Sequence, residues 1–205
     1  MIILGIEGPS HAGKSTFVEL IRDKLNEIGY SVISFPCYMD SINQVERARI
    51  PVDTSISIKD EMNALALFIQ VEKSRRNYIK NNRNLDVVIL DRTFITLLAH
   101  NYAMTKLTKI DFYKPTLNLL TRHFHELVLP DFFVYINTAQ KIMNKRYPIN
   151  DTSVFCNPVY NTYFKQGYFV LKKTGRFIKE SFEFRVETEK LINKALADIL
   201  TQIRG

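Results

Sequence analysis

Cysteine, glycine and proline are all scarce in this sequence. Its 205 residues include only 2 Cys, 7 Gly and 7 Pro. The low glycine and proline content excludes collagen-like and low-complexity chains, and 46% hydrophobic residues exclude a disordered one. Cys37 and Cys156 are too few for a disulfide framework, and neither has a second Cys or His at zinc-finger spacing. A chain of this length can fold without metal or disulfide. Because it has only two cysteines, we expect a protein of a reducing compartment.

Long apolar runs are also missing. No stretch approaches roughly 18 uninterrupted apolar residues, the length that suggests a membrane span. Met1 is followed directly by Ile2-Ile3-Leu4, without the basic segment or the small-residue cleavage site of a signal peptide. These features predict a cytoplasmic protein with no membrane partner.

Positive charge is in surplus, with 28 Lys and Arg against 21 Asp and Glu and a formal net charge of +7. Such a surplus can serve nucleic acid, a membrane surface or a small polyanionic ligand, and composition alone does not choose among them. No base-stacking aromatic residues are interleaved with the main basic cluster in a recognisable pattern, so we interpret it as a solvated helix face and expect no nucleic-acid partner. This cluster consists of Lys73, Arg75, Arg76, Lys80 and Arg83.

The chain alternates between two kinds of hydrophobic pattern. Short runs rich in β-branched or aromatic residues predict buried strands at 2–6, 31–35, 87–90, 132–136 and, more weakly, 176–179. Segments with helical periodicity fill the gaps between them. Strands that alternate with helices predict βαβ units, hence an α/β fold with a mostly parallel sheet covered on both faces. We see no linker or internal repeat, and we expect a single domain over residues 1–205.

Several helix boundaries are marked by their end residues. Gly29 is expected just after the first helix, and Asp60 is expected to cap a long helix before the third strand. Asn157 and Pro158 have the residue types of an N-cap and first helical position. A last helix is predicted from one apolar stripe, Ile192, Leu196, Ile199 and Ile203.

A phosphate-binding pattern follows the first strand. Residues 8–15, GPSHAGKS, match G-x-x-x-x-G-K-[ST] between a buried strand and an amphipathic helix, which is the context that the pattern requires. The glycines let backbone N–H groups turn towards phosphate oxygens, and Lys14 can reach the β- and γ-phosphates. Ser15 would hold magnesium. The alternative is a glycine-rich turn that binds no ligand.

A carboxylate and an arginine follow the third strand. Asp91 lies at the carboxyl edge of the predicted sheet, where open α/β folds bind ligands, and can hold magnesium or its water. Arg92 offers a bidentate fork for a second phosphate. The alternative is that Asp91 caps the next helix and pairs with Arg92.

Lys145 and Arg146 end the helix after the fourth strand and open a polar loop. A closing loop can bring such cations onto a transferring phosphoryl group, so we expect a lid at about 145–157 with Arg146 in the site. For Lys145, a solvated helix C-terminus explains the charge equally well.

Four segments carry a resemblance to a known family. They are the glutamate-glycine P-loop opening at 6–16, the aspartate-arginine motif with its downstream residues at 90–101, the proline-aspartate entry at 129–131, and the closing helix of the lid at 163–171. Over nearly its whole length the chain resembles the thymidylate kinase and deoxynucleoside kinase group of P-loop phosphotransferases. The resemblance implies a five-stranded parallel sheet, the P-loop NTPase fold, and a possible homodimer.

The resemblance also implies roles for individual residues, with ATP and Mg²⁺ as cofactors. Lys14, Asp91, Arg92 and Arg146 would be catalytic, with Ser15 and Asp91 at the metal. Phe68 would stack on the acceptor base, although plain core packing explains it at least as well. Asn101 stands where the family has a substrate-contacting glutamine. The implied nucleotide-binding residues are Gly8, Ser10, His11, Ala12, Gly13, Lys14, Ser15 and Thr16.

Four positions depart from the thymidylate kinase pattern and put thymidylate in doubt as the acceptor. Ser10 replaces the P-loop acid, Glu72 replaces an arginine one turn after the stacking phenylalanine, Thr93 replaces a tyrosine, and Asn101 replaces a glutamine. None of them alters the residues expected to carry phosphoryl transfer.

The identity of the acceptor class depends on a general base. Deoxynucleoside kinases place a glutamate just after strand two, where this chain has Phe35-Pro36-Cys37. A monophosphate is already largely ionised at neutral pH and needs no such base. The sequence therefore favours a nucleoside monophosphate acceptor. A nucleoside or small-metabolite kinase using Asp91 or Asp40 as base is the first alternative, and a P-loop protein that only binds nucleotide is the second.

Overall fold

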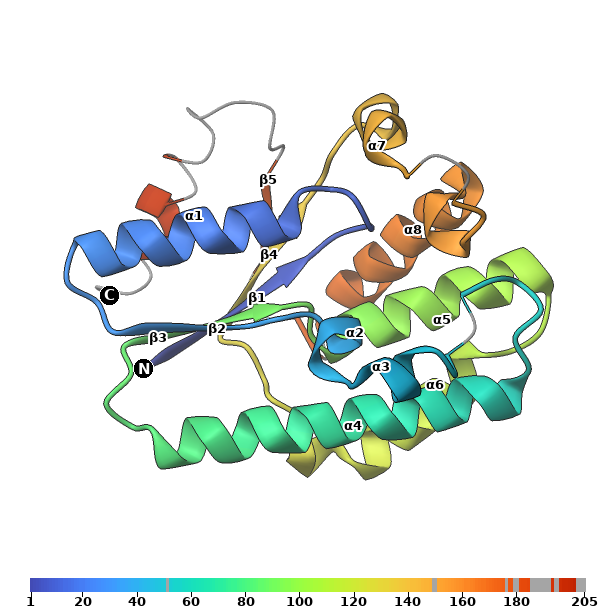
Figure 1. Ribbon diagram of the computed structural model, residues 1–205, viewed down its shortest axis with the longest axis horizontal. Helices are drawn as coiled ribbons and strands as arrows, with labels where there is room; N and C mark the ends of the chain where they lie inside the picture. The colour runs from blue at the N-terminus through green and yellow to red at the C-terminus, as the bar shows by residue number, and fades with distance from the viewer. Residues whose placement is uncertain are drawn as a thin grey trace.

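A computed structural model describes residues 1–50, 52–148, 151–175, 177–178, 181–184, 193 and 196–201. Its centre is a parallel sheet with the strand order β2-β3-β1-β4-β5 (Figure 1). The strands are β1 Ile2–Glu7, β2 Val32–Phe35, β3 Val87–Asp91, β4 Phe132–Ile136 and β5 Ser181–Phe184. The predicted α/β architecture, a parallel sheet flanked by helices, is confirmed.

The central strands are apolar because both of their faces are covered. Every residue of β3 and β4 is buried, as expected for a parallel sheet with helices on both sides. The register pairs Ile6 of β1 with Asp91 of β3 and with Val134 of β4. The segments that follow β1 and β3 therefore leave the same edge of the sheet side by side.

The helices form two layers (Figure 1). On one face, α1 (Lys14–Glu27) packs on the sheet together with the C-terminal helical segment 196–201, whose Ile199 is fully buried. The other face carries α4 (Ile58–Asn81), α5 (Phe94–Thr108), α6 (Tyr113–Arg122) and α8 (Pro158–Thr174). Shorter segments complete the chain: α2 Tyr38–Ser41, α3 Gln44–Arg47, α7 Gln140–Arg146, and 3-10 turns at Phe124–Glu126 and Val154–Cys156. No described helix is both long and apolar enough to cross a membrane.

The fifth strand lies later in the chain than predicted. Of the expected segment 176–179, Arg176 and Lys179 lie outside the described residues, and Phe177 and Ile178 are not in a strand. Ile178 is 2% exposed, and the Phe177 ring packs at 5.8 Å on that of Phe94. This apolar pair fills the core from a connecting segment, because a short apolar run reports burial rather than strand pairing.

The predicted helix ends are mostly confirmed. Gly29 follows α1 with φ of +94°, and the Asn157 side chain accepts from the N–H groups of Val159 and Tyr160 at the start of α8. The prediction for Asp60 was wrong. Ser57 is the N-cap of α4 and Asp60 is its third residue, because the two side chains and backbones form a reciprocal capping box. From the last predicted stripe, Ile192 and Ile203 lie outside the described residues.

Candidate functional site

The P-loop is held in a shape that suits anion binding. Gly8 has φ of +140°, and a Cβ there would lie 2.6 Å from the Ile136 carbonyl oxygen, so no side chain fits. Thr138, just after β4, donates from its hydroxyl to the Ala12 carbonyl at 2.7 Å. These contacts fix the turn between β1 and α1 at the carboxyl edge of the sheet, where the first amide groups of α1 are unpaired within the helix.

Lys14 is buried at the base of this loop. Its ammonium donates to the Pro9 carbonyl at 2.6 Å. Burial, together with the nearby charge of Arg92, lowers the pKa of Lys14 to about 7. A cation destabilised in this way gains from an anionic ligand, since phosphate oxygens would replace the water that burial removed.

Ser15 and Asp91 meet beside the P-loop. The Ser15 hydroxyl donates to Asp91 Oδ2 at 2.7 Å, and Asp91 Oδ1 is buried without a hydrogen-bond partner among the described residues. A hydroxyl and a carboxylate with one free oxygen are the hard oxygen ligands that Mg²⁺ prefers. The alternative for Asp91 is excluded, because Thr93 caps α5 by accepting from the Ile95 N–H.

Arg92 bridges the third strand and the P-loop. Its backbone has φ of +73°, in the left-handed region that is unusual for a non-glycine residue. Its guanidinium donates to the Gly8 carbonyl at 3.2 Å and to the Ser10 hydroxyl at 3.1 Å. The side chain is thereby directed across the gap between the two loops, not towards its neighbour Asp91.

Arg146 reaches the P-loop from the end of α7. It is the last residue of α7 and donates to the His11 carbonyl at 3.1 Å. It lines a cavity of about 460 Å³ that runs over the start of α1. Lys145 is exposed and is not part of this wall, so a solvated helix end accounts for it. The wall consists of His11, Gly13, Lys14, Ser15, Thr16, Phe17, Leu20 and Arg146.

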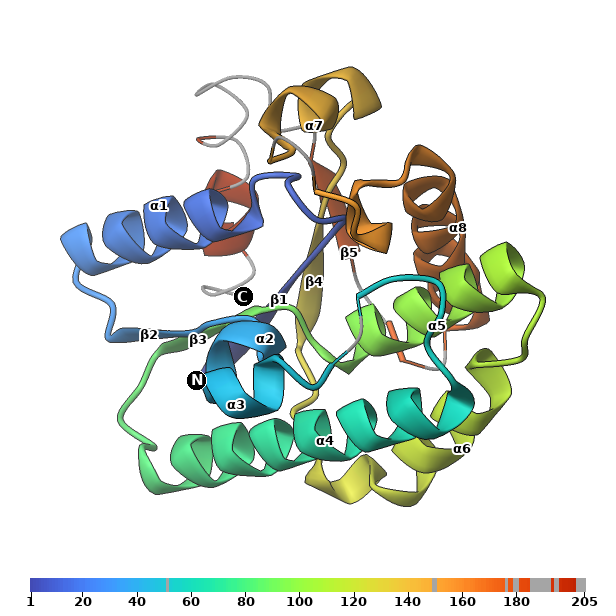
Figure 2. The same cartoon turned by 45° about the vertical axis from the view of Figure 1, so that its right-hand side comes forward.

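A second, larger cavity opens on the other side of the P-loop. Its volume is about 750 Å³, and His11, Lys14 and Ser15 belong to its wall as well as to the wall of the first cavity. Asp91 and Arg92 face it from the sheet edge. Further walls come from α2, α3, α4, α5, α8, the segment between α3 and α4, and the segment after α7, which approaches the P-loop in Figure 2.

Phe68 belongs to this second cavity. It lies on α4, is 8% exposed, and packs its ring 5.2 Å from that of Tyr38. It is therefore both a core residue and an available stacking surface. Three further aromatic residues, Phe155, Tyr160 and Phe164, line the same cavity, so its wall is rich in the aromatic side chains that are typical of ligand pockets.

Asn101 does not line the cavity, contrary to the role that the resemblance implied. It is fully buried and donates from its side chain to Glu61 Oε1 at 2.7 Å. Glu61 itself lines the cavity, as does His100, whose Nδ1 lies 2.7 Å from the Tyr160 hydroxyl. Burial favours protonated Glu61, but hydrogen bonding to His100 and Asn101 and the charge of His100 outweigh it and lower its pKa. Asn101 thus lies behind a carboxylate that faces the cavity, and its side chain holds that carboxylate by a hydrogen bond.

Glu72 and Arg75 form a buried ion pair beneath the site. Glu72 Oε1 accepts from Arg75 at 2.9 Å and from the Tyr38 hydroxyl at 2.9 Å, while its other oxygen accepts from the Val128 N–H at 2.8 Å. Arg75 also donates to the Pro36 carbonyl, and to that of Arg92 at 3.1 Å. Glu72 therefore faces the protein interior and not an acceptor, and Arg75 supports the backbone of Arg92.

The interpretation of the basic cluster as a solvated face was wrong for part of it. Arg75 is 2% exposed, and Arg76 donates to the Leu127 carbonyl at 2.8 Å. Lys73 pairs with Glu126 at 3.2 Å, whereas Lys80 and Arg83 are exposed. The i,i+3 spacing of Glu72 and Arg75 was the available signal for their pairing.

Glu7 is a further buried acid that joins the two loops. Its carboxylate accepts from the N–H and the hydroxyl of Thr93, at 2.9 and 2.6 Å, and from the Thr96 hydroxyl. Burial raises its pKa despite these hydrogen bonds and the charge of Arg92. Glu7 ends β1 and Thr93 is the N-cap of α5, so this group fixes the spacing between the P-loop and Arg92.

Solved structures share this architecture. The thymidylate kinase of Candida albicans superposes with a TM-score of 0.70 at 17% identity, covering 99% of this chain and 92% of that one. Deoxyadenosine kinase from M. mycoides, with dCMP and dCDP bound, gives 0.66 at 16% identity and covers 99% of both chains. The same enzyme with dATP gives 0.65 at 16% identity and full coverage of both. At such identities the likeness establishes the fold.

The sequence itself decides the family. No curated protein sequence matches the chain significantly. The family model for thymidylate kinase matches residues 6–192, which is most of its length. The chain belongs to the thymidylate kinase family and is a nucleotide kinase that transfers phosphoryl groups.

Proposed function

We propose that this kinase transfers the γ-phosphoryl group of ATP to a nucleoside monophosphate, with Mg²⁺ as cofactor. The observation that carries this proposal is the junction of the two cavities. They share His11, Lys14 and Ser15, and Asp91 and Arg92 face the larger one from the sheet edge. A donor phosphate on the P-loop and an acceptor in the larger cavity would meet there, as in-line transfer requires.

Each residue would have a defined role. Lys14 and the loop amides would bind the β- and γ-phosphates, and Arg146 would neutralise the transferring group from the lid. Ser15 and Asp91 would hold Mg²⁺, which would offset the charge of the phosphates. Arg92 would grip the acceptor phosphate, because its guanidinium lies between the P-loop and the larger cavity. Phe68 would support the acceptor base.

A nucleoside acceptor is the second candidate, and Asp40 is the observation that favours it. Asp40 lines the larger cavity shortly after β2, where it accepts from the Cys37 thiol at 3.0 Å and pairs with Arg47 at 3.1 Å. A carboxylate there could take the proton of an attacking hydroxyl. Its engagement with Arg47 and Cys37 is the reason why we place this candidate second.

The test is an ATP-consumption assay over all common nucleoside monophosphates and the matching nucleosides, with Lys14→Ala as the blank. We expect turnover with at least one monophosphate and none in the blank. Turnover with nucleosides alone would replace our proposal by the second candidate. In that case Asp40→Asn should remove most of the rate, and a normal rate in Asp40→Asn would exclude Asp40 as the base.

Arg92→Ala tests the role of the arginine directly. We expect a loss of about 100-fold or more in turnover with ATP binding near normal, because the substrate groups that Arg92 would contact are the acceptor phosphate and the transferring group, whereas Lys14 and the loop amides would bind the other phosphates of ATP. ATP binding is measured separately by calorimetry. An unchanged rate would remove Arg92 from the mechanism.

A further inference from the structure

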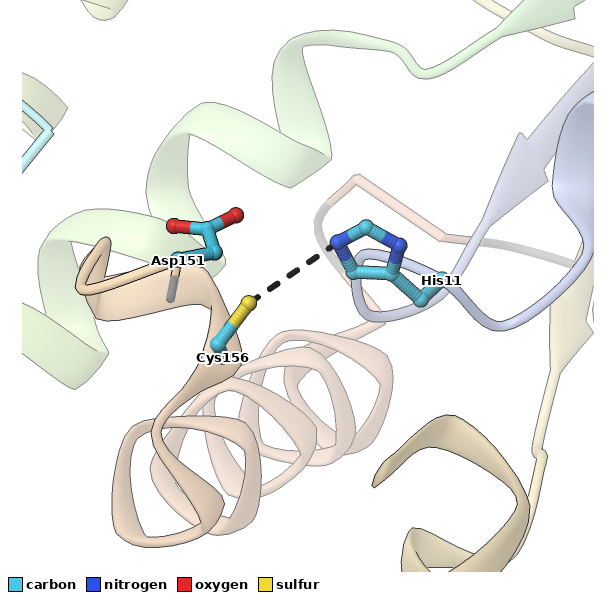
Figure 3. Close-up of side chains that lie close together, drawn as sticks. All are labelled: His11, Asp151 and Cys156. Carbon is cyan, nitrogen blue, oxygen red and sulfur yellow. Dashed lines mark hydrogen bonds between the residues drawn. The ribbon is translucent and has the colours of Figure 1, made fainter. Parts of the chain in front are cut away.

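Three potential metal ligands converge where the lid meets the P-loop (Figure 3). His11 belongs to the P-loop, while Asp151 and Cys156 come from the segment between α7 and α8. One ligand atom from each residue lies within 4.8 Å of the other two, and Cys156 Sγ is 4.0 Å from His11 Nε2. The phosphate-transfer site described above uses neither Asp151 nor Cys156.

The arrangement does not suit a cysteine nucleophile. In a nucleophilic triad the acid orients the far nitrogen of the histidine, whereas here Asp151 faces the thiol itself. Burial and the neighbouring Asp151 raise the pKa of Cys156, which keeps the thiol protonated. An imidazole nitrogen, a carboxylate and a sulfur around one point instead form a donor set for a metal ion.

We propose that His11, Asp151 and Cys156 bind a borderline-soft divalent cation of the Zn²⁺ type. Ligand bonds of about 2.0 to 2.3 Å place neighbouring donor atoms about 3.5 Å apart in a tetrahedral site, so the observed sulfur–nitrogen separation needs only a small side-chain rotation. The fourth position is left to water. On binding, the Cys156 S–H bond breaks, a sulfur–metal bond forms, and the proton passes to solvent.

The donor types separate this site from the magnesium site. Thiolate and imidazole select zinc-like ions, whereas the hydroxyl and carboxylate of Ser15 and Asp91 suit magnesium. Partial burial lowers the pKa of His11; the charge of Asp151 acts in the opposite direction, but the charges of Lys14 and Arg92 add to the effect of burial, so the net shift favours the neutral imidazole that a metal ion binds. The two anions, thiolate and Asp151, compensate an incoming dication.

A metal ion at this position would link the lid segment to the P-loop. His11 lines both cavities and Asp151 lines the larger one, so this link would lie across the junction where donor and acceptor would meet. Lid movements commonly control substrate exchange in kinases. Zinc is therefore expected to inhibit turnover, and this consequence, unlike the binding itself, rests on the proposed function.

Binding is tested on the full chain with Co²⁺ as a spectroscopic probe for zinc. We expect a thiolate-to-cobalt charge-transfer band that Zn²⁺ abolishes by displacement. Cys156→Ser should lose the band and weaken Zn²⁺ binding by more than about tenfold, since even outer-shell partners of a metal contribute that much. Cys37→Ser is the matched control, because it removes the other free cysteine and should retain the band. Absence of the band in the wild type, or its persistence in Cys156→Ser, would overturn the site.

Inhibition is tested separately by titrating Zn²⁺ into the kinase assay at saturating Mg²⁺. We expect inhibition of the wild type and of Cys37→Ser, and resistance in Cys156→Ser, whose zinc-free rate should be retained. Equal inhibition of the wild type and both variants would mean that the inhibitory zinc binds elsewhere. It would overturn the proposal that zinc links the lid segment to the P-loop. If no acceptor supports turnover, the proposed function fails, while the cobalt titration still decides the metal site.

Discussion

The two sides of this site, where we propose that the phosphate donor and the acceptor bind, are built in different ways. On the donor side the P-loop and the start of α1 form one contiguous segment, in which Lys14 is buried with a pKa lowered to about 7. Asp91 Oδ1, at the end of β3 beside this segment, has no hydrogen-bond partner among the described residues. The floor of the acceptor side comes from distant segments, and its charges Glu72 and Arg75 are paired with one another. The first is prepared for a ligand, and the second supports the structure.

Buried charges have different functions on the two sides. A buried charge without a partner costs several kcal/mol, so it is retained where a ligand supplies the partner. A buried pair whose opposite charges compensate each other fixes a geometry and needs no ligand, and this holds for Glu72 and Arg75 although Arg75 Nε has no hydrogen-bond partner among the described residues. Charge-changing substitutions should therefore damage catalysis on the donor side and stability on the acceptor floor.

Removal of the donor-side cation should have the largest effect. Lys14→Ala is expected to lower turnover by about 1000-fold or more, because the ammonium acts on charge that develops in the transition state. The free energy of unfolding should not fall, because the substitution removes a buried cation whose charged form is destabilised in the folded protein. The measurements are single-turnover rates and urea unfolding. A Lys14→Ala variant that is less stable than the wild type but turns over normally when folded would mean that Lys14 serves stability and not catalysis.

Removal of the buried Glu72 carboxylate beneath the acceptor cavity should have the largest effect on stability. Glu72→Ala leaves Arg75 buried without its counter-charge, and we expect a loss of about 3–5 kcal/mol in the free energy of unfolding. Lys73→Ala is the matched control on the same helix, since it breaks only the partly exposed pair with Glu126 and should cost no more than about 1 kcal/mol.

Equal losses in Glu72→Ala and Lys73→Ala, measured by urea unfolding, would mean that the buried pair contributes nothing special. Replacement of both partners, as in Glu72→Leu with Arg75→Met, should recover part of the stability. The double variant should still lose turnover, because Arg75 also donates to the carbonyl of Arg92.

The pH dependence of ATP binding tests whether Lys14, on the donor side, takes up a proton when ATP binds. In the free enzyme Lys14 loses its proton as pH rises through about 7, whereas bound phosphates favour the protonated form. ATP binding at pH 8 should therefore take up a proton, and affinity should fall as pH rises above 7. Calorimetry in buffers of different ionisation enthalpy measures this uptake. In Lys14→Arg the side chain stays charged, so the proton uptake that Lys14 contributes should be lost. Undiminished uptake in this variant would mean that another group takes up the proton.

The smallest effect is expected behind the acceptor cavity. Asn101→Ala removes one hydrogen bond to the buried carboxylate of Glu61 and should raise the KM for the acceptor about fivefold, the equivalent of about 1 kcal/mol. The KM for ATP should stay the same, because Asn101 lines neither cavity. A parallel rise in both KM values would indicate a general loss of structure instead of a loss of positioning.

The α/β alternation and the features that depend on neighbouring residues could be predicted from the amino-acid sequence. The P-loop pattern is read from eight consecutive residues because backbone amides, not distant side chains, form the phosphate cradle. Asp91 and Arg92 could be placed at the sheet edge because a parallel sheet brings the carboxyl ends of its strands together. Gly29 and the pair Asn157-Pro158 marked helix ends because caps depend on near neighbours.

Only the tertiary structure decided the residues whose partners are far away in the chain. Glu72, predicted as a departure in specificity, bonds to Tyr38, Arg75 and the backbone of Val128, and the last of these is 56 positions away. Asn101, predicted at the acceptor, lies behind Glu61 instead. Helical periodicity tells which side of a helix is buried, but not which buried polar group meets which, because packing between elements sets those distances.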